Sequence, residues 1–248
     1  MDLLEALAAD GLVAVVGAGG KKTTLYALAD RLDRAVVTAT TRIPAFPDQV
    51  AELVETDDPV TTLRERDGGA DHWPLGLAPG WADDVRYQGY DADMVTAIAR
   101  AATERRVDAT LVKADGARSR WLKAPAEHEP VVPAMTDTVI PVASARVVGK
   151  PLTEEHVHRP ERVAALTGRE EGAELTTDDV AAVLASPDGG LRNVPDDATV
   201  VALVNMVDDD DLRATAEEVA AGVLARTDRV DRVVTARMDE GRVVATFE

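Results

Sequence analysis

Apolar residues are distributed along this chain in two alternating patterns, short compact runs and longer segments with helical spacing. The short runs are rich in valine and lie at residues 13–16, 35–39, 108–114, 137–143 and 199–204. Such runs are typical of strands that are buried on both faces of a parallel sheet. Between the runs, apolar residues recur every three or four positions, for example in 91–105, which predicts amphipathic helices. The alternation predicts an α/β fold with a mostly parallel sheet and helices on both faces.

The C-terminal part of the chain predicts a different kind of edge. Runs at 232–236 and 242–247 are joined through Glu240-Gly241, which predicts a hairpin and therefore an antiparallel C-terminal edge of the sheet. A proline interrupts the run at 137–143. Because proline has no N–H group for the ladder, Pro141 favours an edge position or a strand end for this run.

Two segments fit the alternation less well. Residues 48–90 have no clear periodicity, and a strand at 72–77 is their best interpretation. Helical patterns near 159–166 and 177–185 suggest a small helical subdomain at about 153–190, beside the sheet. We therefore expect one domain over the whole chain, with this subdomain attached.

A glycine-rich segment separates the first predicted strand from the first long helix. Three glycines stand at positions 17, 19 and 20, and two lysines follow them. Leu25, Leu28 and Leu32 then recur at helical spacing. Glycines let backbone N–H groups turn inward, and the start of a helix carries roughly half a positive charge. We expect the amide groups of residues 17–20 and an adjacent ammonium group to bind the phosphates of a nucleotide.

The match of this segment to the P-loop pattern G-x-x-x-x-G-K-[ST] is imperfect. Val15 stands at the first glycine position and Lys22 stands at the hydroxyl position. The shorter pattern G-x-x-G-K-[ST] of Mur ligases fits as far as Lys21 and fails at Lys22. Either Thr23 takes the metal-binding role of the hydroxyl residue, or the loop bulges and Lys22 binds phosphate. The candidate nucleotide-binding residues are Gly17, Ala18, Gly19, Gly20, Lys21, Lys22, Thr23 and Thr24.

A Rossmann dinucleotide site is the nearest alternative, because Gly17 and Gly19 open the same kind of turn. Its third glycine would fall at Lys22. The acidic residue that follows the second strand of a Rossmann unit is also missing, because 36–41 contains none. The sequence therefore favours the P-loop interpretation.

The composition of the chain strengthens the case that the two lysines after the glycines bind an anion. The chain has 45 acidic and 27 basic residues and a net charge of −18, which argues against nucleic acid as a partner and resembles halophilic proteins. Only 5 of the basic residues are lysines, and two of them follow the glycines. The sequence has no cysteine, which excludes disulfides and cysteine metal sites. Because no apolar run approaches about 18 residues and no signal peptide is recognised, we expect a cytoplasmic protein without a membrane partner.

Polar residues follow other predicted strands at the same edge of the sheet. Thr40 and Thr41 end the second strand, where ligands of parallel sheets are bound, and are candidates for nucleotide contact. Asp115 ends the strand at 108–114, where a P-loop enzyme holds Mg²⁺, so we expect Thr23 and Asp115 to be the metal ligands. An ordinary Asp-Gly turn is the alternative. The locally basic segment that follows adds Arg118 to the catalytic candidates, which are Lys21, Lys22, Asp115 and Arg118.

The run at 199–204 ends in a second motif, Asn205-Met206-Val207-Asp208. It resembles the N-K-x-D motif of GTPases, in which the aspartate reads the guanine edge and the asparagine braces the pocket. Met206 replaces the lysine that covers the base. The motif therefore suggests GTP without excluding ATP, and an acidic cap for the following helix is the alternative for Asp208.

Further motifs give a specific resemblance. They are Asp115-Gly116-Ala117-Arg118, the segment 122–133 with His128-Glu129-Pro130, and His158-Arg159-Pro160-Glu161. Together with Gly17-Ala18-Gly19-Gly20-Lys21, they resemble the YqeC-type family of selenium-dependent hydroxylase accessory proteins over about 12–208. The resemblance implies a P-loop fold and a role in maturing molybdenum hydroxylases, by inserting or modifying selenium or the molybdenum cofactor. Lys113 departs from this family, in which glutamate is expected before Ala-Asp-Gly.

The resemblance implies that the segment from Arg118 to Pro130 presents the molybdenum cofactor or selenium substrate. Lys123, His128, His158 and Arg159 are the substrate-contacting candidates. A metal site formed by His128, His156 and His158 is an alternative. We expect either an Mg²⁺-dependent enzyme that hydrolyses GTP or ATP or transfers its phosphoryl or nucleotidyl group, or a nucleotide-gated carrier without turnover. Lys113 mildly favours the carrier, because a second acidic group near the metal is lost.

Overall fold

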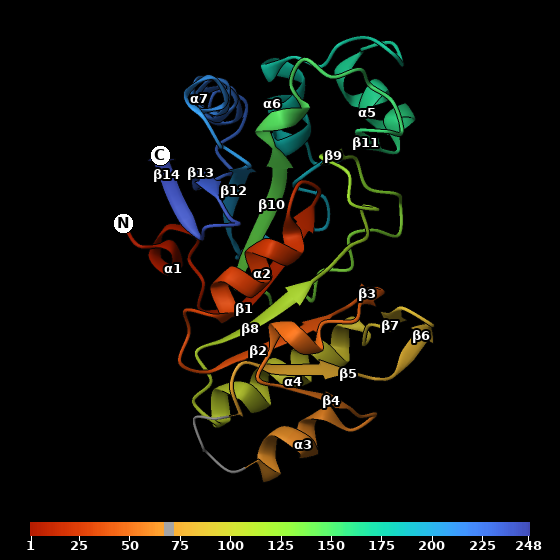
Figure 1. The fold of residues 1–248 in the computed structure, drawn as a ribbon, viewed down its shortest axis with the longest axis vertical. Coiled ribbons are helices and arrows are strands. Elements are labelled where there is room, and N and C mark those ends of the chain that lie inside the picture. Colours follow the sequence, from red (N-terminus) through yellow and green to blue (C-terminus); the bar gives the residue numbers. More distant parts are fainter. Residues whose placement is uncertain (67–71) are drawn as a thin grey trace.

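The computed structural model describes residues 1–66 and 72–248, and its centre is a nine-stranded sheet with the order β14-β13-β12-β10-β1-β8-β2-β5-β4 (Figure 1). The strands of this sheet are β1 (Gly11–Gly17), β2 (Ala35–Ala39), β4 (Glu52–Glu55), β5 (Leu75–Ala78), β8 (Ala109–Lys113), β10 (Thr138–Ser144), β12 (Thr199–Asn205), β13 (Arg232–Arg237) and β14 (Arg242–Phe247). All neighbouring pairs are parallel except β13 and β14. The predicted α/β class, the mostly parallel sheet and the antiparallel C-terminal edge are therefore confirmed.

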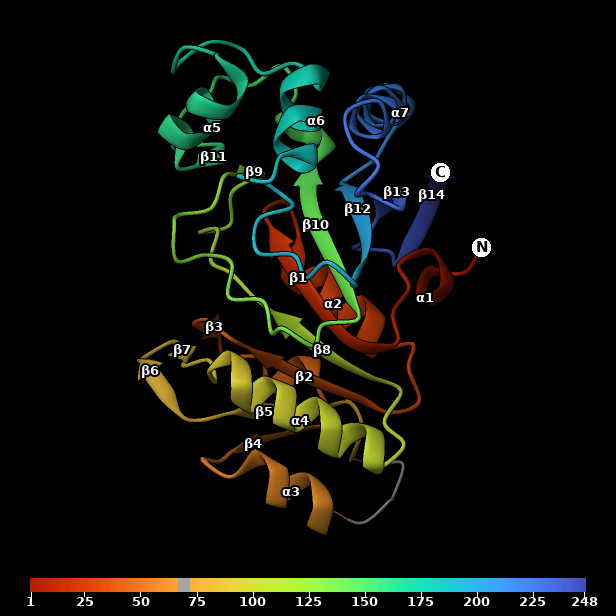
Figure 2. The same cartoon turned by 180° about the vertical axis from the view of Figure 1, so that it is seen from behind.

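Helices cover both faces of this sheet (Figures 1 and 2). The helices are α1 (Leu3–Ala6), α2 (Lys21–Ala29), α3 (Pro59–Glu65), α4 (Ala92–Glu104), α5 (Pro160–Thr167), α6 (Thr177–Ala185) and α7 (Asp210–Leu224), with short 3₁₀ turns at Pro47–Gln49 and Ala145–Val147. In β1, Val13 packs with α2, whereas the adjacent Leu12 packs with α4 on the opposite face. This alternation follows from the two-residue period of a strand. No helix within the described ranges is long and apolar enough to span a bilayer.

The position of β10 contradicts the interpretation of Pro141. β10 lies between β1 and β12, in the interior of the sheet, and Pro141 is paired with Val16 of β1. The ladder to β12 is interrupted at Ile140 and Pro141, where no residue pairs are formed. The missing N–H group is thus accommodated by a local gap in one ladder, and burial on both faces outweighs this loss.

The small helical subdomain expected near 153–190 packs directly on the sheet. Side chains of α6 and α7 share one apolar cluster with β12, and Val163 of α5 belongs to the same cluster. α6 begins with a capping box, because the Thr176 side chain accepts from the Asp179 N–H and Asp179 accepts from the Thr176 N–H. The N-cap of α7 is Asp209, one residue after the position expected from the sequence.

Two small sheets flank the carboxyl ends of the central strands (Figure 1). One has the order β3-β7-β6, with β3 at Ile43–Pro44, β7 at Arg86–Tyr87 and β6 at Trp81–Asp83. The other pairs β9 (Leu122–Lys123) with β11 (Val157–His158). The strand predicted at 72–77 begins later, at Leu75, and becomes β5. These small sheets form the walls on either side of the glycine loop.

Candidate functional site

The glycine loop closes tightly against the end of β10. Gly17, Gly19 and Gly20 have φ angles of 88°, 91° and 124°, which other residues rarely adopt. A Cβ atom on Gly19 would lie 2.5 Å from the backbone nitrogen of Ser144. Gly17 and Gly19 therefore allow a close approach to the β10 backbone, and Gly20 leaves room for the Asn205 side chain.

Contrary to expectation, the first amide groups of this loop are not free to bind phosphate. The Gly17 N–H donates to Asp115 Oδ2 at 2.9 Å, Ala18 N–H donates to the Val142 carbonyl at 2.9 Å, and Gly19 N–H donates to the Arg120 carbonyl at 2.9 Å. The expectation that residues 17–20 present their amides to a ligand is therefore wrong for the first three. Buried amides need acceptors, and these three are used to hold the loop in place.

The outward-facing amides lie at the start of α2 instead. The N–H groups of Gly20, Lys21, Lys22 and Thr23 have no acceptor within the described residues. α2 has no side-chain N-cap bond and no acidic residue in its first turn. Four unsatisfied donors and the positive end of the helix dipole are thus available to an anion.

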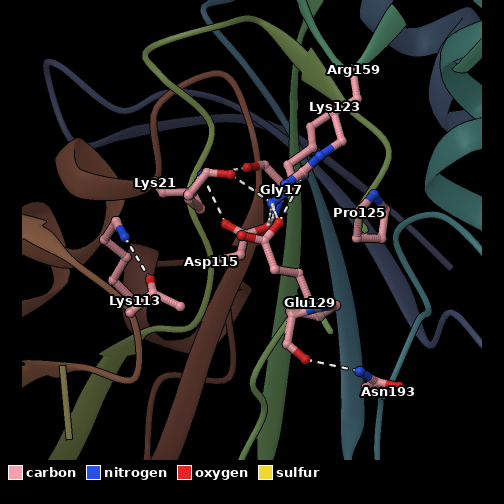
Figure 3. A network of polar contacts seen from close by, with 12 residues as sticks. Gly17, Lys21, Lys113, Asp115, Lys123, Pro125, Glu129, Arg159 and Asn193 are labelled. Atoms are coloured by element: carbon pink, nitrogen blue, oxygen red, sulfur yellow. Dashed lines mark hydrogen bonds and ion pairs between the residues drawn. The ribbon is translucent and has the colours of Figure 1, made fainter. Parts of the chain in front are cut away.

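Beneath the loop, Asp115 joins two lysines (Figure 3). Lys21 Nζ lies 3.0 Å from Asp115 Oδ1 and also donates to the Gly17 carbonyl. Lys123 Nζ lies 2.9 Å from Asp115 Oδ2. Burial alone would raise the pKa of Asp115, but the two ammonium groups outweigh it and hold this pKa below its usual range. Asp115 is only 1% exposed, so its charge depends on these partners.

The ionic network continues from Lys123 to the segment that precedes α5. Lys123 Nζ lies 2.7 Å from Glu129 Oε2, and Arg159 Nη1 donates to the same oxygen at 2.8 Å. Burial would raise the pKa of Glu129, but Lys123 and Arg159 lower it. The network therefore connects the glycine loop with two of the motifs that carried the family resemblance (Figure 3).

Lys113 lies beside this network but has no carboxylate partner. Its Nζ donates to Thr41 Oγ1 at 2.9 Å and to the Arg42 carbonyl at 2.7 Å. No ion pair of Lys113 occurs in the described part of the chain, and the residue is only 5% exposed. Burial, assisted by repulsion from Lys21, lowers the pKa of Lys113 to about 7.

A cavity of about 820 Å³ opens in front of the glycine loop and the lysines. Its basic lining residues are Lys21, Lys22, Arg42, Arg86, Lys113, Arg118, Arg120 and Arg159, and its histidines are His128 and His158. Glu129 is the one acidic residue among those that line it. In a chain with 45 acidic residues, this concentration of positive charge indicates a site for an anionic ligand.

The lining also contains strained backbone. Arg118, Ser119, Arg159 and Met206 have φ angles of 47°, 59°, 64° and 62°. Left-handed geometry costs a non-glycine residue about 1–2 kcal/mol. Four such residues on one cavity wall are typical of a functional site, where the surrounding structure maintains the strain.

Some of the predicted residues face away from the cavity. Thr24 is buried and its hydroxyl donates to the Gly20 carbonyl, while the Thr40 hydroxyl donates to the Val131 carbonyl. Thr41, in contrast, lies on the cavity lining. Thr24 and Thr40 therefore have structural hydrogen bonds in place of ligand contacts.

Asn205, expected from the N-K-x-D resemblance to help recognise the base, contacts the glycine loop. Its Nδ2 donates to the Gly19 carbonyl at 2.8 Å, and its Oδ1 accepts from the Met238 N–H at 3.0 Å. Asp208 does not belong to the cavity lining, because its Oδ2 accepts from Arg146 Nε at 2.6 Å. Within this motif, Met206 is the residue that reaches the cavity.

The oxygens expected to bind Mg²⁺ do not fit a metal in this arrangement. Both oxygens of Asp115 are paired with ammonium groups, and Thr23 is exposed on the first turn of α2. The described residues contain no group of three or more His, Asp or Glu side chains that could hold a metal ion. His156 stacks on Trp121 at 5.2 Å instead of joining His128 and His158. The alternative of a histidine metal site is therefore wrong.

Two contributors to the cavity were missed by reasoning from the sequence. Arg86 lies on β7, within the segment that showed no clear periodicity. Lys113 was treated as the loss of a carboxylate, not as a cation of the site. The scarcity of lysine was the available signal, because four of the five lysines (Lys21, Lys22, Lys113 and Lys123) lie in the cavity or the network beneath it.

Comparison with known proteins decides the family. The family described as YqeC protein matches residues 13–161, which is more than half of the chain. The "Uncharacterized protein YqeC" of Escherichia coli (strain K12) is 31% identical over 200 residues, covering 78% of this chain and 75% of that protein. This chain belongs to the YqeC family. Every cavity residue except Met206 lies within the range that matches YqeC.

Proposed function

We propose that this YqeC-family protein binds GTP or ATP and acts as an accessory protein in the maturation of selenium-dependent molybdenum hydroxylases or their molybdenum cofactor. One observation carries the nucleotide proposal. Four amides at the start of α2 have no acceptor among the described residues, and their residues line a cavity whose described lining has eight basic residues and one acidic residue. The accessory role rests on the motif resemblance described above.

The phosphates belong at the start of α2, next to Lys22. Lys22 lines the cavity and has no hydrogen bond or ion pair within the described residues. Lys21, in contrast, already contacts Asp115 and the Gly17 carbonyl. Lys22 is therefore the ammonium group that can contact a phosphate without breaking an ion pair. This agrees with the alternative in which Lys22, and not Lys21, is the phosphate-binding lysine.

Part of the cavity lining suits a larger organic group. Trp121 and Met206 line it together with His128 and His158. Burial and the nearby Arg159 lower the pKa of His158 to about 4, so this ring is neutral at physiological pH. A base or pterin ring can pack on such neutral, polarisable surfaces. We place the molybdenum-cofactor or selenium substrate against these residues.

Binding is tested by titrating the protein with fluorescent GTP and ATP analogues. We expect saturable binding, and we expect K22A to weaken it about tenfold or more, as the loss of a charged hydrogen bond implies. K150A is the matched control, because Lys150 is exposed and does not line the cavity. The K21A/K22A double variant should lose binding. Absence of saturable binding for both nucleotides would refute the proposal.

A carrier without turnover is the second candidate, and one observation favours it. Glu129 is the only carboxylate on the described cavity lining, and Lys123 and Arg159 already hold it. A general base needs a lone pair that can accept a proton from the attacking group. Multiple-turnover assays of phosphate release with GTP and ATP, with and without molybdenum cofactor, separate the two candidates. Sustained phosphate or nucleotidyl release would exclude the carrier.

A further inference from the structure

Lys113 is a buried ammonium group without a carboxylate partner among the described residues. It lies at the end of β8, the strand between β1 and β2, and it lines the cavity. Its two hydrogen-bond acceptors, Thr41 Oγ1 and the Arg42 carbonyl, are both neutral. An ammonium group has three N–H donors, so one remains for a ligand. Burial of an unpaired charge is costly, and an anion in the cavity would compensate it.

The carboxylates near Lys113 cannot supply this compensation. Asp115 is shared by Lys21 and Lys123, and Glu129 is shared by Lys123 and Arg159. Lys21, Lys123, Arg159 and Lys113 thus give this cluster four cationic side chains, whereas Asp115 and Glu129 give it two carboxylates. The net charge of the cluster is therefore positive, which favours the binding of an anion.

We propose that this site binds its phosphate-bearing ligand without a divalent cation, with the ammonium group of Lys113 neutralising the phosphate charge that Mg²⁺ neutralises in other P-loop proteins. The proposal deepens the nucleotide-binding function and rests on it. Lys113 acts together with the amides of Gly20 to Thr23, which lie on the same cavity.

Competition for the oxygens of Asp115 decides between an ammonium group and a metal ion. Mg²⁺ requires close, nearly octahedral oxygen ligands. To bind Asp115 it would have to displace Lys21 or Lys123 from a carboxylate that is almost fully buried, and both lysines would repel it. A phosphate group leaves these ion pairs intact and gives Lys113 a partner. The arrangement therefore favours the anion over the metal.

The test measures binding of two probes, a fluorescent GTP analogue and inorganic tripolyphosphate, in EDTA and in millimolar Mg²⁺. We expect both probes to bind in EDTA, with dissociation constants no more than about threefold weaker than in Mg²⁺. K113M should weaken binding in EDTA about tenfold or more, because it removes a charged hydrogen bond. K150M should match the wild type. Circular dichroism checks that K113M is folded, and the comparison of EDTA with Mg²⁺ needs no variant.

The outcomes separate the two proposals. Binding of both probes only with Mg²⁺, or unchanged binding by folded K113M, would overturn the metal-independent site and leave nucleotide binding intact. Binding of tripolyphosphate but not of the nucleotide in EDTA would support the lysine site and contradict nucleotide recognition. If neither probe binds under either condition, both proposals are wrong.

Discussion

The buried ammonium group of Lys113 predicts an unusual dependence of stability on pH. Its pKa falls from 10.5 in a model peptide to about 7 in the folded protein. Between these two values the unfolded chain holds a proton that the folded chain has released. The unfolded state binds more protons, so the free energy of unfolding rises as pH increases from about 7 to about 10.5. The penalty of burying this lysine is largest below pH 7.

The magnitude follows from the size of the shift. The 3.5-unit difference between 10.5 and about 7 corresponds to roughly 5 kcal/mol over the full range. Between about pH 7.5 and 9.5, linkage gives a gain of about 2.5 kcal/mol in the free energy of unfolding. The charged groups that act on Lys113 are Lys21, Asp115, Lys123 and Glu129. Lys21 also has a lowered pKa, so the wild-type curve alone is not specific for Lys113.

The assay is urea denaturation of wild type, K113M and the control K150M across this pH range, without ligand. K113M removes the titrating group, so its free energy of unfolding should gain about 2.5 kcal/mol less than that of the wild type. K150M should follow the wild type. Burial raises the pKa of Tyr26 from 10.0 to about 12, so this tyrosine lowers the free energy of unfolding mainly above the range, and it does so equally in the wild type and in K113M. Parallel curves for K113M and the wild type would refute the reasoning.

Two further substitutions test the loop and the second motif. N205A should lower the free energy of unfolding by about 1–3 kcal/mol in urea melts and weaken nucleotide binding, because the Gly19 carbonyl and the Met238 N–H lose a buried partner. An unchanged midpoint would contradict the bracing role. D208A should leave GTP and ATP affinities within about threefold of wild type, because Arg146 holds this carboxylate. A selective loss of GTP affinity would show that Asp208 reads guanine after leaving Arg146.

Local sequence patterns predicted the strand, the glycine loop and the helix that form the base of the site. The run at 13–16, the glycines and the helical spacing of Leu25 and Leu28 lie within a short stretch, and they correspond to β1, the loop and the start of the helix at Lys21. Asp115 was also expected at the end of a strand, and it lies two residues after the end of β8. These features depend on backbone preferences and on neighbouring residues, which a sequence expresses directly.

Long-range contacts determined what the sequence could not predict. The amides of Gly17 and Gly19 turn away from the cavity because Asp115 and the Arg120 carbonyl accept from them, and both acceptors lie about a hundred residues away along the chain. Pro141 lies inside the sheet because both faces of β10 are buried there. A local sequence pattern does not contain these distant partners. The acceptor of a single amide and the position of a strand within the sheet can therefore be read only from the folded structure.

The network beneath the loop gives the family motifs a physical meaning. Lys123 and Glu129 come from the segment 122–133, and Arg159 comes from the segment before α5. Asp115 links these residues to Lys21 at the start of α2. The motifs thus hold one continuous ionic network in place.

The most direct test of phosphate binding at the start of α2 is to follow backbone amide resonances during a titration with GTP. The account predicts that the amides of Gly20, Lys21, Lys22 and Thr23 shift most, because they have no acceptor within the described residues. The amides of Gly17, Ala18 and Gly19 should shift less, since each already donates to a protein oxygen. Saturable binding that leaves residues 20–23 unshifted would contradict the central claim.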